Sequence, residues 1–257
     1  HAQFLLPLHT PPPGTLVIAV RDAPLAAPMP PLTPLFRTEI WELWQDEFGR
    51  YMFVAPRQSP PKRITVTPDF TSGEAWADFG SQGVTRAYPL QSLDIRLWAN
   101  WLAASGDLLL HASGVAIEGH GLAFLGSSGA GKSTLVQVLA TYPEVTVLGE
   151  DQVVLRYLDG RFWIYGTPWH EREGLCSPMG VPLEHLFVLD RKAPRALAAL
   201  SADAGIMRVL QTAFIPYYCP QAVSAILDRL ALLAETIPFY TLAYRLGSDV
   251  LALLRSI

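Results

Sequence analysis

The chain has 257 residues, half of them hydrophobic and only 16% charged, which is enough apolar material for one large domain or two small ones. Its net charge of −4 gives no basic footprint for nucleic acid, and no apolar run reaches the ~18 residues needed to cross a bilayer. The two cysteines, Cys176 and Cys219, lack the spacing of a metal site or a disulfide framework, which favours a reducing, cytoplasmic location.

The first third of the chain predicts β structure. Residues 1–35 are rich in proline and contain one candidate strand, at 15–20. Residues 38–45 and 51–54 favour strands around a turn, and 64–67 alternate apolar with polar side chains. We therefore predict a β-rich N-terminal domain over residues 1–90.

The rest of the chain alternates helical and strand patterns. An amphipathic helix is predicted over 91–104, and Asp159-Gly160 predicts a hairpin. Further strands are predicted at 108–117, 122–125, 145–148, 185–189 and 239–246, and helices at 201–214, 220–235 and after a cap at Ser248 or Asp249. This alternation predicts a second domain of α/β class over residues 91–257.

One stretch dominates this second domain. It reads Gly126-Ser127-Ser128-Gly129-Ala130-Gly131-Lys132-Ser133-Thr134, the G-x-x-x-x-G-K-S pattern known as Walker A, between a predicted strand and a predicted helix. Glycines let successive backbone N–H groups point inward as a nest for phosphate oxygens, and the helix N-terminus adds positive partial charge. Lys132 is expected to reach the β- and γ-phosphates, and the Ser133 hydroxyl to bind Mg²⁺.

Two adjacent carboxylates, Glu150 and Asp151, end the strand predicted after this loop and its helix. Ligands gather at the carboxyl ends of strands in such sheets, and a metal ion would relieve the repulsion between the two charges. Neighbouring side chains at a strand end point in different directions. One carboxylate is therefore expected to face Mg²⁺ and the other a phosphate acceptor, with an exposed acidic turn as the alternative.

Three weaker candidates lie elsewhere. His111 falls in an otherwise apolar strand, where a histidine is most often a satisfied core residue. The polar loop 166–174 holds Glu171 and Glu173, either of which is a candidate metal contact. Arg245 is a candidate clamp for a γ-phosphate.

Several classes of phosphate-loop protein are excluded by missing motifs. The guanine-reading Asn-Lys-x-Asp motif is absent, because the one asparagine, Asn100, precedes the loop. A Leu-Ser-Gly-Gly-Gln-like transporter signature is also missing. In small adenylate-type kinases the loop follows the first strand, whereas here it follows about half the chain.

The remaining pattern resembles the catalytic domain of HPr kinase/phosphorylase. The similarity is carried by His111 to Ala116, Gly126 to Thr134 and Leu148-Gly149-Glu150-Asp151, within residues 105–175. It looks closer to the HPr-kinase-like proteins of peptide-modifying systems, including lasso-peptide kinases. The resemblance implies a P-loop catalytic domain with a mixed β-sheet flanked by helices, following the β-rich N-terminal domain.

The resemblance also implies roles for single residues. Lys132 matches the family's phosphate-binding lysine, Ser133 and Asp151 match its metal ligands, and Glu150 matches the aspartate that takes the acceptor's proton. His111 matches the histidine near that base. Glu150 is one methylene longer than the family's aspartate, and the family's signature loop is absent. Glu171 or Glu173 stands in that region, and HPr itself is not supported as the substrate.

These observations predict an ATP- and Mg²⁺-dependent kinase that phosphorylates a hydroxyl, with a serine of a peptide or protein as the expected acceptor. The alternatives are a nucleotide-gated peptide-binding module and an ATPase without an acceptor. Relatives assemble through this domain, so a homo-oligomer is compatible with the pattern. We expect no nucleic acid and no membrane partner.

Overall fold

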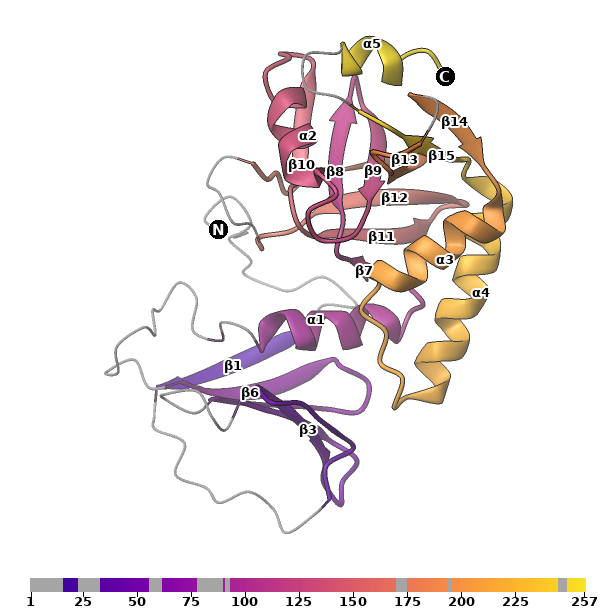
Figure 1. The fold of residues 1–257 in the computed structure, drawn as a ribbon. Coiled ribbons are helices and arrows are strands. Elements are labelled where there is room, and N and C mark those ends of the chain that lie inside the picture. The colour runs from indigo at the N-terminus through magenta and orange to yellow at the C-terminus, as the bar shows by residue number, and fades with distance from the viewer. Residues whose placement is uncertain are drawn as a thin grey trace. The chain divides into compact units, whose positions relative to one another are not determined.

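The computed structural model describes residues 16–22, 33–55, 62–77, 90, 93–169, 175–193, 196–244 and 249–257. Within these ranges the chain is mixed α/β, with two mixed sheets and five helices (Figure 1). It divides into two compact units, one of Leu6–Trp101 and one that contains Leu102–Ile257. The domain bounds expected from the sequence, 1–90 and 91–257, remain a prediction. The division at Trp101 places most of the first helix in the same unit as the N-terminal sheet.

The N-terminal unit contains a six-stranded sheet in the order β1-β6-β5-β4-β3-β2, in which only the β1–β6 pair is parallel. Its elements are β1 (Val17–Asp22), β2 (Phe36–Arg37), β3 (Glu42–Gln45), β4 (Tyr51–Ala55), β5 (Lys62–Val66), β6 (Ser72–Ala77) and α1 (Asp94–Ala103). Strand β5 alternates buried and half-buried residues, as its sequence predicted. Strand β6 was not predicted, because Ser72 and Gly73 disfavour a strand.

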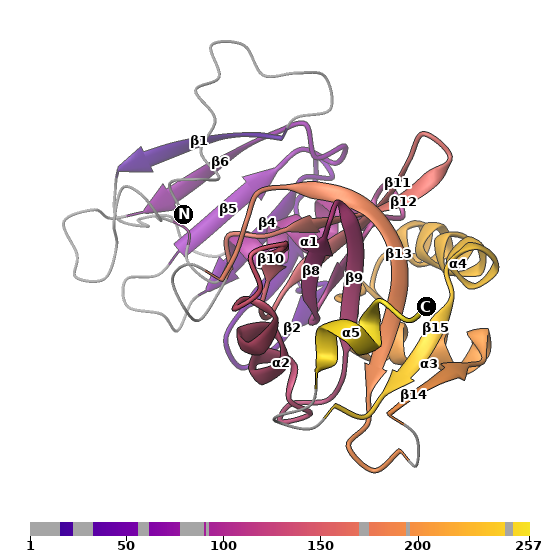
Figure 2. The same ribbon diagram turned by 90° about the horizontal axis from the view of Figure 1, so that it is seen from above.

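The C-terminal unit contains a larger sheet in the order β10-β8-β9-β13-β12-β11-β7, with β15 beside β13 and β14 beside β15. Its strands are β7 (Leu108–Leu110), β8 (Ser113–Ile117), β9 (His120–Leu125), β10 (Val145–Gly149), β11 (Val153–Leu158), β12 (Arg161–Gly166), β13 (Gly180–Leu189), β14 (Leu197–Leu200) and β15 (Phe239–Leu242). Its helices are α2 (Lys132–Leu139), α3 (Ala202–Thr212), α4 (Pro220–Thr236) and α5 (Val250–Leu254). The ten-residue β13 curves across the unit (Figure 2), pairing with β12 at its start and with β9 and β15 further on.

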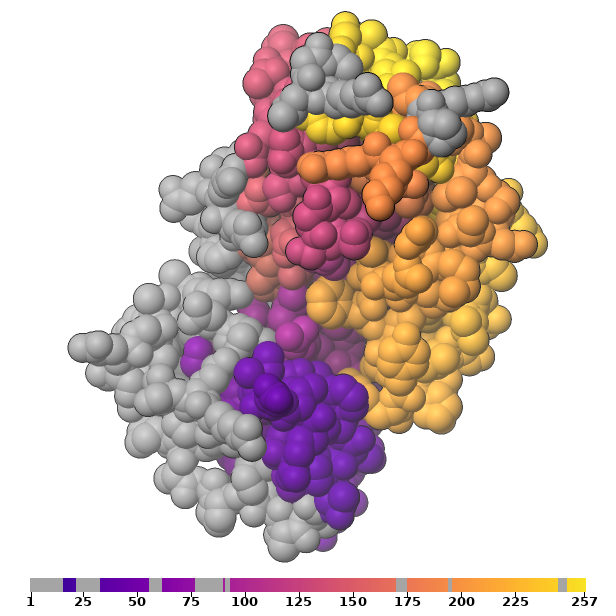
Figure 3. Space-filling view, in the orientation of Figure 1, coloured from indigo at the N-terminus to yellow at the C-terminus, as the bar shows by residue number. Residues whose placement is uncertain are grey.

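Strand β9 separates two hydrophobic cores, because successive side chains of a strand point to opposite faces. Leu122 and Phe124 pack with residues of α2 and α5, whereas Ala123 and Leu125 pack with residues of α3 and α4. Helices α2 and α5 therefore cover one face of this part of the sheet, and α3 and α4 the other. In the space-filling view, α3 and α4 form a continuous surface in orange to yellow (Figure 3).

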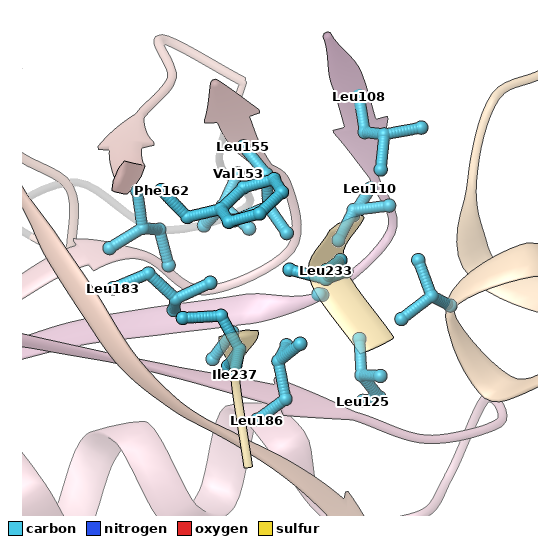
Figure 4. Packing of buried hydrophobic residues seen from close by; sticks show 14 of the residues in the cluster. Leu108, Leu110, Leu125, Val153, Leu155, Phe162, Leu183, Leu186, Leu233 and Ile237 are labelled. Atoms are coloured by element: carbon cyan, nitrogen blue, oxygen red, sulfur yellow. The ribbon is translucent and has the colours of Figure 1, made fainter. Parts of the chain in front are cut away.

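Strands β11 and β12 form the predicted hairpin and fold over one of these cores. Asp159 and Gly160 both have positive φ, at 51° and 80°, as the two-residue turn requires. Side chains of β7, β11, β12, β13 and α4 point toward one another in this core (Figure 4). A Cβ on Gly121 of β9 would lie 2.4 Å from Ile164 Cγ2, so only glycine lets β12 approach so closely.

The single strand predicted at 108–117 is two strands. β7 pairs with β11, while β8 pairs with β9 and β10, and the chain breaks between them at His111 and Ala112. The His111 backbone N–H donates instead to Thr212 O, at 2.8 Å. The prediction of one continuous strand was therefore wrong, because an apolar run does not reveal that its halves pair with different partners.

Asp249 caps the last helix, as one of the two alternatives predicted, with its Oδ1 accepting from Ala252 N at 3.0 Å. Ser248 lies outside the described residues. Of the helices in the described ranges, none combines the length and apolar character required to cross a membrane.

Phe187 should be a main anchor of the C-terminal unit. Its ring is fully buried and stacks on Phe124 and Tyr240, with centroid distances of 5.4 and 5.7 Å. We expect Phe187→Ala to lower the free energy of unfolding by about 3–5 kcal/mol, measured by denaturant titration. Leu227→Ala, at an exposed site on α4, should change it by less than about 0.5 kcal/mol; similar losses in both variants would contradict this assignment.

Candidate functional site

The glycine-rich loop, residues 126–131, connects the carboxyl end of β9 to the first turn of α2. Gly129 and Gly131 have φ of 78° and 105°, a region that other residues rarely adopt. Gly131 is the N-cap of α2 and provides no side-chain hydrogen bond. The first-turn N–H groups of a helix have no partner within the helix, so this end of α2 offers donors and positive partial charge to an anion.

Lys132 begins α2 and turns its side chain back under the loop. The residue is buried, and its Nζ donates to Gly126 O at 2.8 Å and to Ser127 O at 3.5 Å. Nζ also lies 3.3 Å from His111 Nε2. Burial lowers the pKa of Lys132, while the negative charge of Asp151 acts to raise it. The ammonium group is therefore held beneath the place where an anion on the loop would lie.

Asp151 and His111 form a pair next to this lysine. His111 Nδ1 lies 3.1 Å from Asp151 Oδ1. Strand β10 is antiparallel to β8 and β8 is antiparallel to β9, so β10 and β9 run in the same direction. Their carboxyl ends meet at one edge, which brings Asp151 to the start of the loop. The break between β7 and β8 allows His111 to reach the same point.

The surroundings of Asp151 favour its ionised form. The hydrogen bond from His111 lowers the pKa of Asp151 most, against the opposing effect of burial. The Gln152 amide at 3.4 Å and the charge of Lys132 lower it further. With Nδ1 donating to Asp151, His111 Nε2 is the acceptor facing Lys132, so the three side chains form a continuous chain of polar contacts.

Glu150 is placed differently from its neighbour. The residue is only 1% exposed, and its backbone carbonyl accepts the Ser113 hydroxyl at 2.5 Å. Asp151 keeps 31% of its side chain exposed. Of these two adjacent carboxylates, solvent and ligands therefore reach that of Asp151 more readily.

A cleft of about 600 Å³ opens beside the first half of the loop. His111, Gly126, Ser127 and Ser128 line one side, and Asp190, at the end of β13, also faces it. The opposite wall is formed by α3 and its approach: Leu200, Ala204, Arg208, Gln211 and Thr212. The cleft is thus large enough for a small molecule or a short peptide segment, with His111 at its edge.

The remaining predicted residues fall in two groups. Ser133 and Thr134 are half-buried in the first turn of α2. Glu171, Glu173 and Arg245 lie outside the described residues, so their predicted roles stay predictions.

Sequence reasoning missed Arg191, whose Nη2 lies 2.7 Å from where a Cβ on Gly131 would be. Its only sequence signal is its position, two residues after a buried strand parallel to β9.

The donor set suits a hard cation. In the described ranges, no group of three or more His, Cys, Asp or Glu side chains is arranged to hold a metal ion. Mg²⁺ bound through phosphate oxygens needs only one or two protein ligands, such as a carboxylate and a hydroxyl. The ionised Asp151 and the Ser133 hydroxyl meet this requirement in their chemistry.

No protein-family model and no curated protein matches this chain. Among solved structures, it is similar to the Hpr(Ser) kinase/phosphatase from Coxiella burnetii, with 12% sequence identity and a TM-score of 0.36. The similarity covers 58% of this chain and 86% of that one. It is a distant structural likeness that does not establish membership of that family, so function has to be argued from the site.

The pairing of Asp151 with His111 can be tested by titration. We expect His111→Ala to raise the pKa of Asp151, because the main contact that lowers it is removed. In the wild type, the ionised Asp151 stabilises the fold above its unfolded-state pKa of about 4, and this contribution is lost as pH falls through its pKa in the folded protein. The contribution should be smaller in His111→Ala. His111→Asn, whose amide can replace Nδ1 as donor, should keep the pKa low.

The readout is the carboxyl ¹³C shift of Asp151 against pH. His120→Ala is the matched control, because His120 makes a similar contact with Glu184, at 3.3 Å, outside the site. An unchanged Asp151 pKa in His111→Ala would show that the pair does not control this carboxylate.

Proposed function

We propose that this protein is a Mg²⁺- and ATP-dependent kinase that transfers the γ-phosphate to a hydroxyl group. One observation carries the proposal: the buried Lys132 ammonium lies beneath the glycine-rich loop and 3.3 Å from His111, which pairs with Asp151 at the edge of a cleft. A phosphate bound on the loop would thereby lie within reach of a cation, a carboxylate and a proton acceptor, as phosphoryl transfer requires.

The loop and Lys132 bind the phosphate chain of the donor. Backbone N–H groups of the loop and of the first turn of α2 donate to its oxygens. The Lys132 ammonium leaves the carbonyl of Gly126 and turns to the β- and γ-phosphates, where it stabilises the charge that develops during transfer. The loss of solvent around a buried lysine strengthens this interaction.

Ser133 and Asp151 would hold Mg²⁺ together with phosphate oxygens. The ion, when bound, neutralises charge on the β- and γ-phosphates. The low pKa of Asp151 supports this role, because a metal ligand must be ionised. Its contact with His111 fixes the orientation of the carboxylate.

His111 is the group we assign to proton transfer. When Lys132 moves to the phosphates, Nε2 of His111 becomes free to accept the proton of the acceptor hydroxyl, and Asp151 stabilises the imidazolium. The acceptor oxygen bonds to the γ-phosphorus, the bond from that phosphorus to the β–γ bridging oxygen breaks, and ADP leaves. The sequence favoured Glu150 as the base, but its burial leaves His111 better placed to meet an acceptor in the cleft.

The acceptor we favour is a serine of a peptide or protein. The cleft provides space for a chain segment, and its α3 wall carries Arg208, Gln211 and Thr212 as polar contacts. A small alcohol would also fit the volume. A nucleotide-gated binding module and an ATPase without acceptor are the competing outcomes of the experiments that follow.

Lys132→Ala should reduce phosphoryl transfer about 100- to 1,000-fold, because a preorganised donor to the transferred group is lost. The measurement is phosphate added to candidate peptides in the presence of ATP and Mg²⁺, followed by mass spectrometry. Lys192→Ala removes the same side chain from an exposed position and should retain activity. Full transfer by Lys132→Ala would refute the mechanism. ATP binding without transfer would favour the binding module. Phosphate release without an acceptor would favour the ATPase.

His111→Asn and Glu150→Gln separate the two candidate bases. His111→Asn keeps a donor to Asp151 but cannot take a proton, so transfer should fall about 100-fold or more. Glu150→Gln conserves shape and should lower transfer by less than about tenfold if the buried carboxyl is not the base. Single-turnover rates at saturating ATP provide the comparison. A larger loss of transfer in Glu150→Gln than in His111→Asn would identify Glu150 as the base.

A further inference from the structure

Two side chains that the proposed mechanism does not use lie at the ends of neighbouring parallel strands. Strand β13 is parallel to both β9 and β15, so all three carboxyl ends lie at the edge that carries the glycine-rich loop. Arg191 follows β13 and Tyr244 follows β15, each two residues after its strand. The Asp190 backbone N–H donates to Leu242 O at 3.1 Å, which joins the two strand ends. Ligands of open α/β sheets bind at such edges.

Arg191 lies against the far end of the loop. Its Nη2 is 2.7 Å from the position of a Cβ on Gly131, a space that is open only because the residue is glycine. Gly131 is also the N-cap of α2. The guanidinium group is therefore placed at the first turn of this helix, at the opposite end of the loop from Gly126 and His111.

This position is electrostatically unfavourable for a cation without an anion. The N-terminus of α2 carries positive partial charge, and Lys132 adds a full positive charge in the next residue. Two other arginines of this unit form ion pairs: Arg156 with Asp107 at 2.7 Å, and Arg255 with Glu144 at 3.1 Å. Within the ranges that the structure describes, the Arg191 guanidinium forms no ion pair or hydrogen bond. A bound anion would relieve the repulsion.

Tyr244 provides a second, independent indication. Its hydroxyl oxygen is buried and has no hydrogen-bond partner among the described residues. Burial raises the pKa of Tyr244, and the charge of Arg191 acts to lower it, so the guanidinium group lies within electrostatic range of this hydroxyl. A buried hydroxyl without a partner costs free energy, which a ligand oxygen at this place would recover.

We propose that Arg191 and Tyr244 form a subsite for the nucleoside end of the phosphate donor. The Arg191 guanidinium binds the α-phosphate, and the Tyr244 hydroxyl donates to an oxygen of the α-phosphate or the sugar. The donor thus lies along the loop, with its terminal phosphate toward His111 and the cleft and its nucleoside toward the ends of β13 and β15. This inference rests on the proposed function and adds to it the direction in which the nucleotide binds.

The experiment measures ADP and inorganic pyrophosphate binding to the full chain with Mg²⁺ by calorimetry. Arg191→Ala should weaken ADP binding about 10- to 100-fold, since a hydrogen bond between charged groups is lost. Arg191→Lys keeps the positive charge but loses the planar guanidinium group. Its ADP affinity should therefore lie between those of the wild type and of Arg191→Ala. Tyr244→Phe should weaken ADP binding about tenfold. Pyrophosphate bound at the β- and γ-phosphate positions would reach neither Arg191 nor Tyr244, so its affinity should change less than about twofold in all three variants.

The controls are matched in chemistry. Arg161→Ala removes an exposed arginine that stacks on Trp163, and Tyr217→Phe removes an exposed hydroxyl. Both should bind ADP like the wild type. If the wild type binds ADP and Arg191→Ala and Tyr244→Phe bind it equally well, the subsite is refuted while the kinase proposal stands. An equal loss of pyrophosphate binding would refute the nucleoside-end assignment. If the wild type binds neither ATP nor ADP, the proposed function itself fails.

Discussion

The buried ammonium group of Lys132 is the constraint on which the candidate site depends. A charge removed from water must be met by other polar groups, and here two loop carbonyls and His111 provide them. These contacts tie the lysine to the glycine-rich loop. They also link the loop to Asp151 through His111, so that Lys132, His111 and Asp151 form one connected set of side chains.

The sheet places these groups where they can meet. Strands β9 and β10 run in the same direction, and β13 and β15 join them, so loops that are far apart in sequence end at one edge. The two hydrophobic cores on either side of β9 fix that edge against α2 on one face and α3 on the other. Because the loop connects β9 directly to α2, packing of the helix determines how its N-terminus is presented.

Much of the secondary structure follows from local patterns. The hairpin at Asp159-Gly160, the helices α1, α3 and α4 and the cap at Asp249 all lie where the sequence predicted them. The break at His111 does not follow from any local pattern, since it arises because Leu108–Leu110 and Ser113–Ile117 pair with different strands. The different exposure of Glu150 and Asp151 is likewise a matter of packing, because adjacent carboxylates have the same intrinsic chemistry.

The amino-acid sequence by itself determined the loop, its lysine and serine, and the acidic pair that follows the next strand, because these depend on residue type and short spacing. Only the tertiary structure decided that His111 bridges Lys132 and Asp151, that Glu150 is buried, and that Arg191 and Tyr244 lie near the far end of the loop. Those relations join residues from separate strands, and strand order and direction are set by packing of the whole sheet rather than by any single segment.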